Sequence, residues 1–375
     1  MKNIARAATA ASLALLLVTA CSQENGESSA SAEKAAKSQP QLGSGIATEN
    51  FDESVRPQDD FYRYVNGKWL DRTEIPADRS NYGSFTELAE EAEEAQLEII
   101  KAAAANADAS GEERKIGDFY TAFMDKDRVE ELGMAPATPM MERIDEIESH
   151  EDVIRYIGEQ QKHRITTPIG FWVNNDSKEP TRYAVYLTQN GLGLPNRDYY
   201  EKEGFADKKA AYGKYIADLL DLSGFDRAPD RAAAVLDLEE RMAMVQWTPT
   251  ENRDRNATYN KFTLEELNEV GDNFDWPLFL EAAGIHDKIE DVIVRQPSYA
   301  AALGDIVRET DVETWKDYFR FHGMNSAAPF LSSDFVELHF DFNGRTLAGT
   351  EQNRPRWKRA VGMINNVLGE AVGKI

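Results

Sequence analysis

Apolar residues recur at helical spacing along most of the chain beyond residue 45. One helix is predicted to begin at Ser84, where Ser84 and Glu87 form a candidate capping box, and Thr263 with Glu266 forms a second such start. The same spacing predicts further helices over 111–125, 137–148, 151–163, 206–223, 228–246, 297–309, 311–321 and 353–375. The pattern therefore predicts a mainly α-helical fold.

Two short stretches favour strands instead of helices. Ile169–Val173 and Tyr183–Leu187 are rich in aromatic and β-branched residues and flank a polar connection, 174–182. They predict a small β-hairpin near 167–188. We find no internal repeat, which argues against a solenoid.

The first 45 residues have a different pattern. Lys2 and Arg6 precede an apolar stretch, 7–20, which is shorter than the roughly 20 apolar residues that a bilayer span needs. It is typical of a secretory signal. The stretch ends Val18-Thr19-Ala20-Cys21, which resembles a bacterial lipobox, so Cys21 is the predicted lipid anchor. The alternative is ordinary cleavage after Ala20, which would leave a free thiol.

The segment after Cys21 is predicted to be a disordered tether. Residues 22–45 contain no aromatic residue and a single Leu, too little apolar surface to offset the entropy of ordering. We therefore divide the chain into a signal peptide (1–20), a tether (21–45) and one folded domain (46–375). Ser22 indicates the periplasmic side of the outer membrane, because bacterial lipoproteins without Asp at that position usually travel there.

Composition excludes several classes of protein. The chain has 375 residues, of which 42% are hydrophobic, so it can build a substantial core. Its net charge of −24 argues against a nucleic-acid partner, since a phosphate backbone would be repelled over most of the surface. A mean hydropathy of −0.55 argues against a multi-span membrane protein. The single cysteine excludes a disulfide framework and a Cys-rich zinc module.

The sequence contains no recognisable catalytic motif. A hydrolytic zinc site most often shows as His-Glu-x-x-His on a helix, and none of the five histidines has another four residues on. His150 comes nearest, but Ile154 takes the place of the second ligand, so His150 is predicted to be a surface residue at a helix boundary. There is no Gly-x-Ser-x-Gly elbow and no phosphate-binding loop. The sequence thus predicts no catalytic residue and no metal ligand in this chain.

Three segments have residue patterns that composition alone does not explain: 59–70, 189–200 and 247–261. The first has apolar residues at helical spacing, and Asn66-Gly67 is expected to break or cap that helix. In the second, glycines and Pro195 predict a rigid turn, after which Asn196 or Asp198 could start a helix. Taken singly, each segment is typical of a packing element.

Taken together and in this order, the segments resemble the N-terminal half of the neprilysin and endothelin-converting-enzyme family of zinc metallopeptidases. The family shows D-F-[YF]-x-Y-x-x-G-x-W-L, Tyr-Gly-x-Phe, G-L-G-L-P-x-R-D-Y-Y, R-x-x-x-Y-N-K and W-[KR]-R with N-x-x-x-G-x-x-x-G-[KR]. The matching residues here are 59–70, Tyr82–Phe85, Gly191–Tyr200, Arg255 with Tyr259–Lys261, Trp357–Arg359, and Asn365, Gly369, Gly373 and Lys374. The resemblance covers roughly 46–375.

The resemblance implies one of two largely helical lobes that enclose a cavity. In the family, the N-terminal lobe restricts which peptides enter. The C-terminal lobe carries His-Glu-x-x-His, a downstream Glu that completes the zinc ligands, and an Asn-Ala-x-Tyr strand that holds the substrate; none of these is in this sequence. Zinc would therefore be bound by residues outside this chain.

One position departs from the mammalian pattern. Mammalian neprilysin has an Arg before Tyr-Gly-x-Phe that meets the carboxylate of short peptides, and Asn81 stands there in this sequence. Asn81 is thus a candidate substrate-cavity residue. It has no charge, so the resemblance does not support a carboxydipeptidase-like preference.

The last predicted helix stays apolar to Ile375, and we interpret it as a helix cut before its end, with an apolar face that lacks part of its partner. The combined hypothesis is the N-terminal lobe of a lipid-anchored zinc metalloendopeptidase of the cell envelope. Its partners would be peptide substrates, the C-terminal zinc domain and the membrane. The alternatives are a non-catalytic envelope lipoprotein that binds peptides or a protein, and a glycosidase with an acidic pair.

Overall fold

The computed structural model describes residues 45–375 except 164 and 272, and these divide into two compact units. One unit ends at Thr73 and the other comprises Glu74–Ile375. The predicted signal peptide, the lipid anchor Cys21 and nearly all of the tether lie outside the described residues. Among the residues that the structure does describe, no helix is both long and apolar enough to span a bilayer.

The first unit is built around helix α1 (Phe61–Arg72), which begins at the capping side chain of Asp60. The prediction that Asn66-Gly67 would break or cap this helix is wrong, because α1 continues through both residues. Gly67 is buried, and a Cβ at that position would overlap the Cβ of Asp52. Glycine is therefore needed there for the close approach of the segment before the helix, and not for chain reversal.

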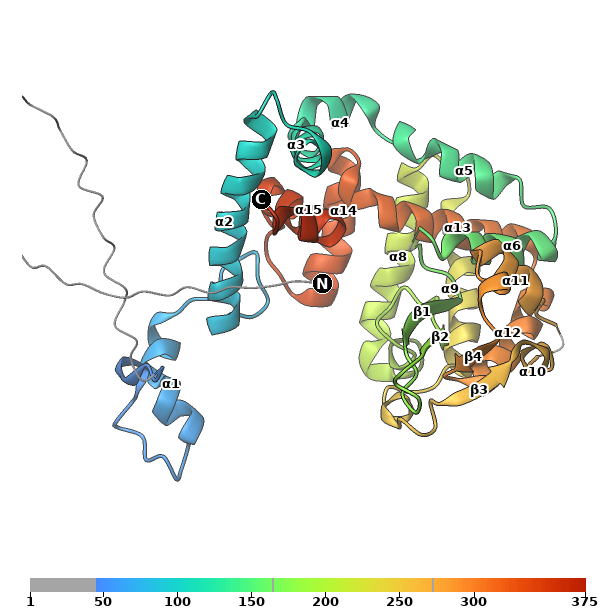
Figure 1. Ribbon diagram of the computed structural model, residues 1–375, viewed down its shortest axis with the longest axis horizontal. Helices are drawn as coiled ribbons and strands as arrows, with labels where there is room; N and C mark the ends of the chain where they lie inside the picture. The colour runs from blue at the N-terminus through green and yellow to red at the C-terminus, as the bar shows by residue number, and fades with distance from the viewer. Residues whose placement is uncertain (1–44, 164, 272) are drawn as a thin grey trace, which may run out of the picture. The chain divides into compact units, whose positions relative to one another are not determined.

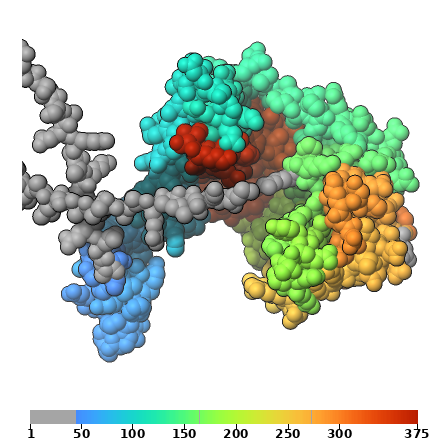
Figure 2. All heavy atoms as spheres, in the orientation of Figure 1, coloured from blue at the N-terminus to red at the C-terminus, as the bar shows by residue number. Residues whose placement is uncertain are grey.

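Within the second unit, α2 (Ser84–Ala105), α3 (Gly111–Met124) and α15 (Arg356–Val372) pack together around their own core (Figures 1 and 2). The core side chains include Ile100, Ile116, Val361 and Ile364, all fully buried. These helices cover most of the apolar face of the last helix, while Val367 is 55% exposed. The expectation that this face lacks part of its partner stays a prediction.

Polar side chains join the same helices. Arg354 contacts both carboxylate oxygens of Glu93 at 2.6 and 2.7 Å, and Lys358 lies 3.2 Å from Glu90. The glutamate-rich face of α2 is therefore partly an interface. The helix beginning at Ser84 is confirmed, but its predicted cap is wrong: the N-cap residue is Gly83, and no side chain caps it.

The remaining helices, apart from α4, contribute to the larger core (Figure 1). They are α4 (Lys126–Leu132), α5 (Thr138–Asp145), α6 (His150–Gln160), α7 (Asp198–Glu201), α8 (Ala206–Leu222), α9 (Ala228–Val245), α10 (Leu264–Asn268), α11 (Trp276–Ala283), α12 (Pro297–Glu309), α13 (Val312–Ala327) and α14 (Ser333–Phe340). A π-helical segment, Asp341–Ala348, continues α14. The mainly α-helical prediction is confirmed, and the Thr263–Glu266 capping box is present; α4, α11 and α14 were not predicted.

A four-stranded sheet lies among these helices. Its strands are β1 (Ile169–Asn175), β2 (Tyr183–Gln189), β3 (Asn260–Thr263) and β4 (Asp291–Val294), in the order β1-β2-β4-β3. The predicted hairpin is confirmed as the antiparallel pair β1–β2. The other two strands were missed because each has four residues, too few for a period-2 pattern to show.

Asp176, in the connection between β1 and β2, joins the hairpin to the third of the family-like segments, 247–261. Its side chain is fully buried, lies 3.0 Å from Lys261 Nζ and accepts a hydrogen bond from the Tyr259 hydroxyl at 2.9 Å. Burial alone would raise the pKa of Asp176. The backbone N–H of Lys178, the Lys261 ammonium and the Tyr259 hydroxyl outweigh burial and lower that pKa to about 2.

The centre of the larger core contains a buried carboxylate, that of Glu239 on α9. One oxygen accepts from the Tyr212 hydroxyl and from His322 Nε2, both at 2.8 Å. The other accepts from the backbone N–H of Gly193 at 3.0 Å and from the Tyr200 hydroxyl at 2.5 Å. Four donors therefore satisfy a charge that burial would otherwise make costly.

The second of the family-like segments, 189–200, supplies two of these donors, the Gly193 N–H and the Tyr200 hydroxyl. Tyr212 lies on α8. Burial, and next the Glu239 carboxylate, raise the pKa of both Tyr200 and Tyr212, so both hydroxyls keep their protons and donate. A Cβ at Gly193 would overlap the Tyr212 hydroxyl. The glycine is thus required for the turn to approach the carboxylate closely.

Replacing Glu239 with Ala should lower the free energy of unfolding by about 3 kcal/mol or more, because four buried donors lose their acceptor. Urea denaturation followed by circular dichroism measures this loss. The matched control is Glu240→Ala on the same helix, where a half-exposed carboxylate pairs with Lys209 at 3.1 Å; it should cost less than about 1 kcal/mol. Equal losses in the two variants would contradict the assigned role of Glu239.

Replacing Asp176 with Asn should flatten the acid side of the stability profile. A carboxyl group whose pKa is lowered by folding stabilises the protein above its ordinary pKa of 3.8, and that contribution is lost as the pH falls from 3.8 towards about 2. The variant should therefore be less stable than the parent at pH 6, with a difference that shrinks below pH 3.8. Urea midpoints across this range measure it, with the exposed Asp118→Asn as control.

Candidate functional site

The second and third motifs contact each other through a reciprocal pair of hydrogen bonds. Gln189 donates from Nε2 to the carbonyl of Trp247 at 2.9 Å, and its Oε1 accepts from the backbone N–H of Trp247 at 2.7 Å. Arg197 donates to the carbonyl of Gln246 at 2.7 Å. The two segments line a small cavity of about 230 Å³. Their polar groups are largely used within the lobe, which agrees with the interpretation of these motifs as packing elements.

Asn81 lies in the exposed segment immediately before α2. Nearby in the first two turns of α2, Phe85 is 86% exposed and Leu88 is 61% exposed. Asn81 lines neither this cavity of about 230 Å³ nor the cavity beside α14 that is described below. Its assignment as a substrate-cavity residue therefore stays a prediction.

The histidines do not converge on a metal site. Across residues 45–375, apart from 164 and 272, no group of three or more His, Cys, Asp or Glu side chains could hold a metal ion. His150 opens α6 as predicted, but it is half-buried, and its Nε2 donates to the carbonyl of Thr310 at 2.9 Å. His322 donates from Nε2 to the buried carboxylate of Glu239. Burial lowers the pKa of His339 to about 4. These residues do not fit a zinc site.

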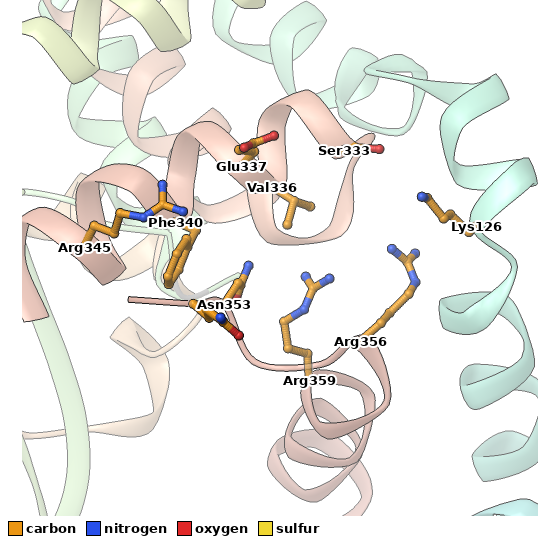
Figure 3. A pocket seen from close by; sticks show the side chains of 10 residues that line it. Lys126, Ser333, Val336, Glu337, Phe340, Arg345, Asn353, Arg356 and Arg359 are labelled. Carbon is orange, nitrogen blue, oxygen red and sulfur yellow. The ribbon is translucent and has the colours of Figure 1, made fainter. Parts of the chain in front are cut away.

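A cavity of about 420 Å³ lies between α4, α14, the π-helical segment and the N-terminal end of α15, and we call it the basic pocket. Four cationic side chains line it: Lys126, Arg345, Arg356 and Arg359. Figure 3 shows Lys126, Arg356 and Arg359 directing their nitrogens toward the space beside α14. This concentration of positive charge is unexpected in a chain of net charge −24.

Three of these cations have no carboxylate partner within the described residues: Lys126, Arg356 and Arg359 form no ion pair there. Arg345 differs, because it pairs with Asp341 and stacks on Phe340. Burial, and next the proximity of Arg356, lower the pKa of Arg359. Both causes mean that the positive charge of Arg359 is held at an energetic cost.

The acidic groups near the pocket are few. Glu337 lines it. Glu130 accepts from the backbone N–H and the hydroxyl of Ser333 at the start of α14. Those hydrogen bonds, and after them the charges of Lys126 and Arg356, lower the pKa of Glu130. The pocket therefore has an excess of positive charge, and its chemistry is that of an anion site. No motif predicted it, because Lys126 and Arg356 are 230 positions apart in the sequence.

Comparison with known proteins identifies the family. Residues 57–375 match the N-terminal model of Peptidase family M13. Endothelin-converting enzyme 1 of Rattus norvegicus is 27% identical over 344 residues, which cover 86% of this chain and 44% of that protein. Endothelin-converting enzyme-like 1 of the same organism is 26% identical over 346 residues, which cover 87% and 44%. The chain thus spans less than half the length of these relatives.

Solved structures agree with these matches. The crystal structure of the zinc metalloprotease ZMP1 of Mycobacterium tuberculosis, in complex with an inhibitor, matches with a TM-score of 0.85 and 36% identity, covering 89% of this chain and 52% of that one. PepO of Lactobacillus rhamnosis HN001 shares the fold, with a TM-score of 0.72 at 19% identity and coverage of 85% and 51%. The chain belongs to Peptidase family M13, the neprilysin-like family of zinc metallopeptidases, and corresponds to the N-terminal domain of its members.

Proposed function

We propose that this chain is the N-terminal lobe of a lipid-anchored zinc metalloendopeptidase that hydrolyses peptides in the cell envelope. The observation that carries the proposal is the match to the zinc metalloprotease of Mycobacterium tuberculosis, at 36% identity and over 89% of this chain. The match covers 52% of that protein, so the activity would belong to a longer polypeptide of which this lobe is one part.

In this proposal the lobe contributes enclosure and size selection, while the zinc chemistry lies elsewhere. The described residues offer no group of side chains that could hold a metal ion. Zinc would therefore be bound by residues outside this chain. The rigid helical packing around Glu239 and the α2–α3–α15 core suits a wall that restricts which peptides reach the site.

We expect residues 1–375 to cleave no peptide with added zinc, and a longer form that continues into a His-Glu-x-x-His segment to cleave in a chelator-sensitive way. A quenched fluorescent peptide measures the rate. A set of substrates from short peptides to a folded protein tests size selection, with the rate expected to fall as the substrate grows. Zinc-dependent cleavage by residues 1–375 alone would overturn the assignment of the catalytic groups. A longer form that cleaves nothing would favour the binding-lipoprotein alternative.

Lipid anchoring is supported by the sequence alone, through Lys2 and Arg6, the apolar stretch 7–20 and the lipobox-like ending at Cys21. Replacing Cys21 with Ser should move the protein from the membrane fraction to the soluble fraction, because the thioether that would hold the lipid cannot form. Cell fractionation with incorporation of labelled fatty acid measures both effects. Ser22→Ala serves as the neighbouring control, and a parent protein without incorporated lipid would contradict the proposal.

A further inference from the structure

We propose that the basic pocket is a binding site for an organic carboxylate, held by Arg356 and Arg359 with its apolar part against Val336 and Phe340. The inference goes beyond the proposed function, because it rests on side chains of this lobe and requires neither zinc nor peptide hydrolysis. The shared chemistry is a carboxylate on an apolar body, whether that is a free acid or an acidic group of a polypeptide.

The first argument is that the two arginines are already oriented. Arg356 donates from Nε to the carbonyl of Phe123 at 2.7 Å, and its guanidinium carbon lies 5.1 Å from the centre of the Phe123 ring. Arg359 donates from one terminal nitrogen to the carbonyl of Pro329 at 3.3 Å. These contacts hold the side chains in place and leave the terminal nitrogens of Arg356 free of protein partners, so little ordering is required when an anion binds.

The second argument is the local balance of charge. Lys126, Arg356 and Arg359 face the pocket without an acidic partner among the described residues, whereas Asp341 neutralises Arg345. Glu337 is the acidic side chain that lines the pocket. Glu130 is hydrogen-bonded to Ser333 at the start of α14, and its carboxylate also attracts Lys126 and Arg356 at longer range. Three cations without an ion pair, against Glu337 and the nearby Glu130, leave an excess of positive charge that favours an anionic ligand. An oxyanion between Arg356 and Arg359 would also relieve their mutual repulsion.

The third argument is the size and apolar character of the pocket. Its volume of about 420 Å³ is much larger than an inorganic anion needs. Val336 and Phe340 form an apolar wall on α14, opposite the arginines of α15 (Figure 3). A ligand with both a carboxylate and an apolar group would use both surfaces. Inorganic phosphate would use only the cationic one.

The test is isothermal titration of the purified chain with N-acetyl-L-phenylalanine, and with its uncharged amide, at low ionic strength. We expect the acid to bind at least about tenfold more tightly than the amide, and its affinity to fall as salt is added. Inorganic phosphate should bind more weakly than the acid. Equal affinity for acid and amide, no binding of the acid up to about 10 mM, or phosphate binding as tight as the acid would each overturn the proposal.

Substitutions locate the site. Arg356→Gln and Arg359→Gln should each weaken binding of the acid by about tenfold or more, because each removes a charged donor. Arg356→Lys should restore part of the affinity lost in Arg356→Gln. Arg114→Gln is the control, since Arg114 pairs with Asp118 on the exposed side of α3. Circular dichroism melting shows that each variant is folded, and full affinity in both folded glutamine variants would contradict the assignment.

The same titration on the longer polypeptide separates the two sources of carboxylate. If the acid still binds there, the ligand is a free acid. If binding is lost in the longer form and regained when the rest of the polypeptide is removed by proteolysis, the carboxylate belongs to the same protein. Because neither readout involves peptide cleavage, a failure of this proposal is distinguishable from a failure of the proposed peptidase function.

Discussion

The buried carboxylate of Glu239 is the interaction on which the larger core depends. A fully buried charge is tolerated only when it is completely hydrogen-bonded, and here the donors come from the turn at Gly193, from Tyr200, from α8 and from α13. None of these segments can shift without leaving either the carboxylate or a buried donor unsatisfied. The glycine-rich turn, Tyr200 and the central helices α8, α9 and α13 therefore have one mutual arrangement.

Residues of the family motifs take part in such buried polar contacts. Tyr200 donates to Glu239, and Gly193 makes room for the Tyr212 hydroxyl. In the third motif, Tyr259 and Lys261 bind the buried Asp176 of the hairpin. The residues that carry the family resemblance thus join distant parts of the lobe.

The charge distribution gives a second level of organisation. The acidic face of α2 is partly neutralised by Arg354, just before the last helix, and by Lys358 on that helix. These ion pairs help to hold α2, α3 and α15 together. Two other arginines near the start of that helix, Arg356 and Arg359, are directed into the basic pocket and find no carboxylate among the described residues. The same short segment therefore supplies both an internal ion-pair network and the cations of a separate pocket.

Local sequence determined much of the secondary structure. Helical spacing predicted most of the long helices, the aromatic runs predicted the β1–β2 hairpin, and the order of the motifs indicated the family. These signals are local, because periodicity and turn chemistry act within one turn or one hairpin. Strands β3 and β4 have four residues each, and they exist because β4 pairs with β2, which lies about a hundred residues earlier.

Only the tertiary structure decided which residues from distant parts of the chain come into contact. Asn66-Gly67 is a breaker by local chemistry, but the helix continues because Gly67 packs against Asp52. The sequence does not show which helices pack on the apolar face of α15, and α2 and α3, more than 200 residues earlier, cover most of it. Glu239 and the basic pocket likewise assemble side chains from several helices. Residue spacing along the chain does not determine these long-range contacts, because they depend on how whole helices pack in the assembled core.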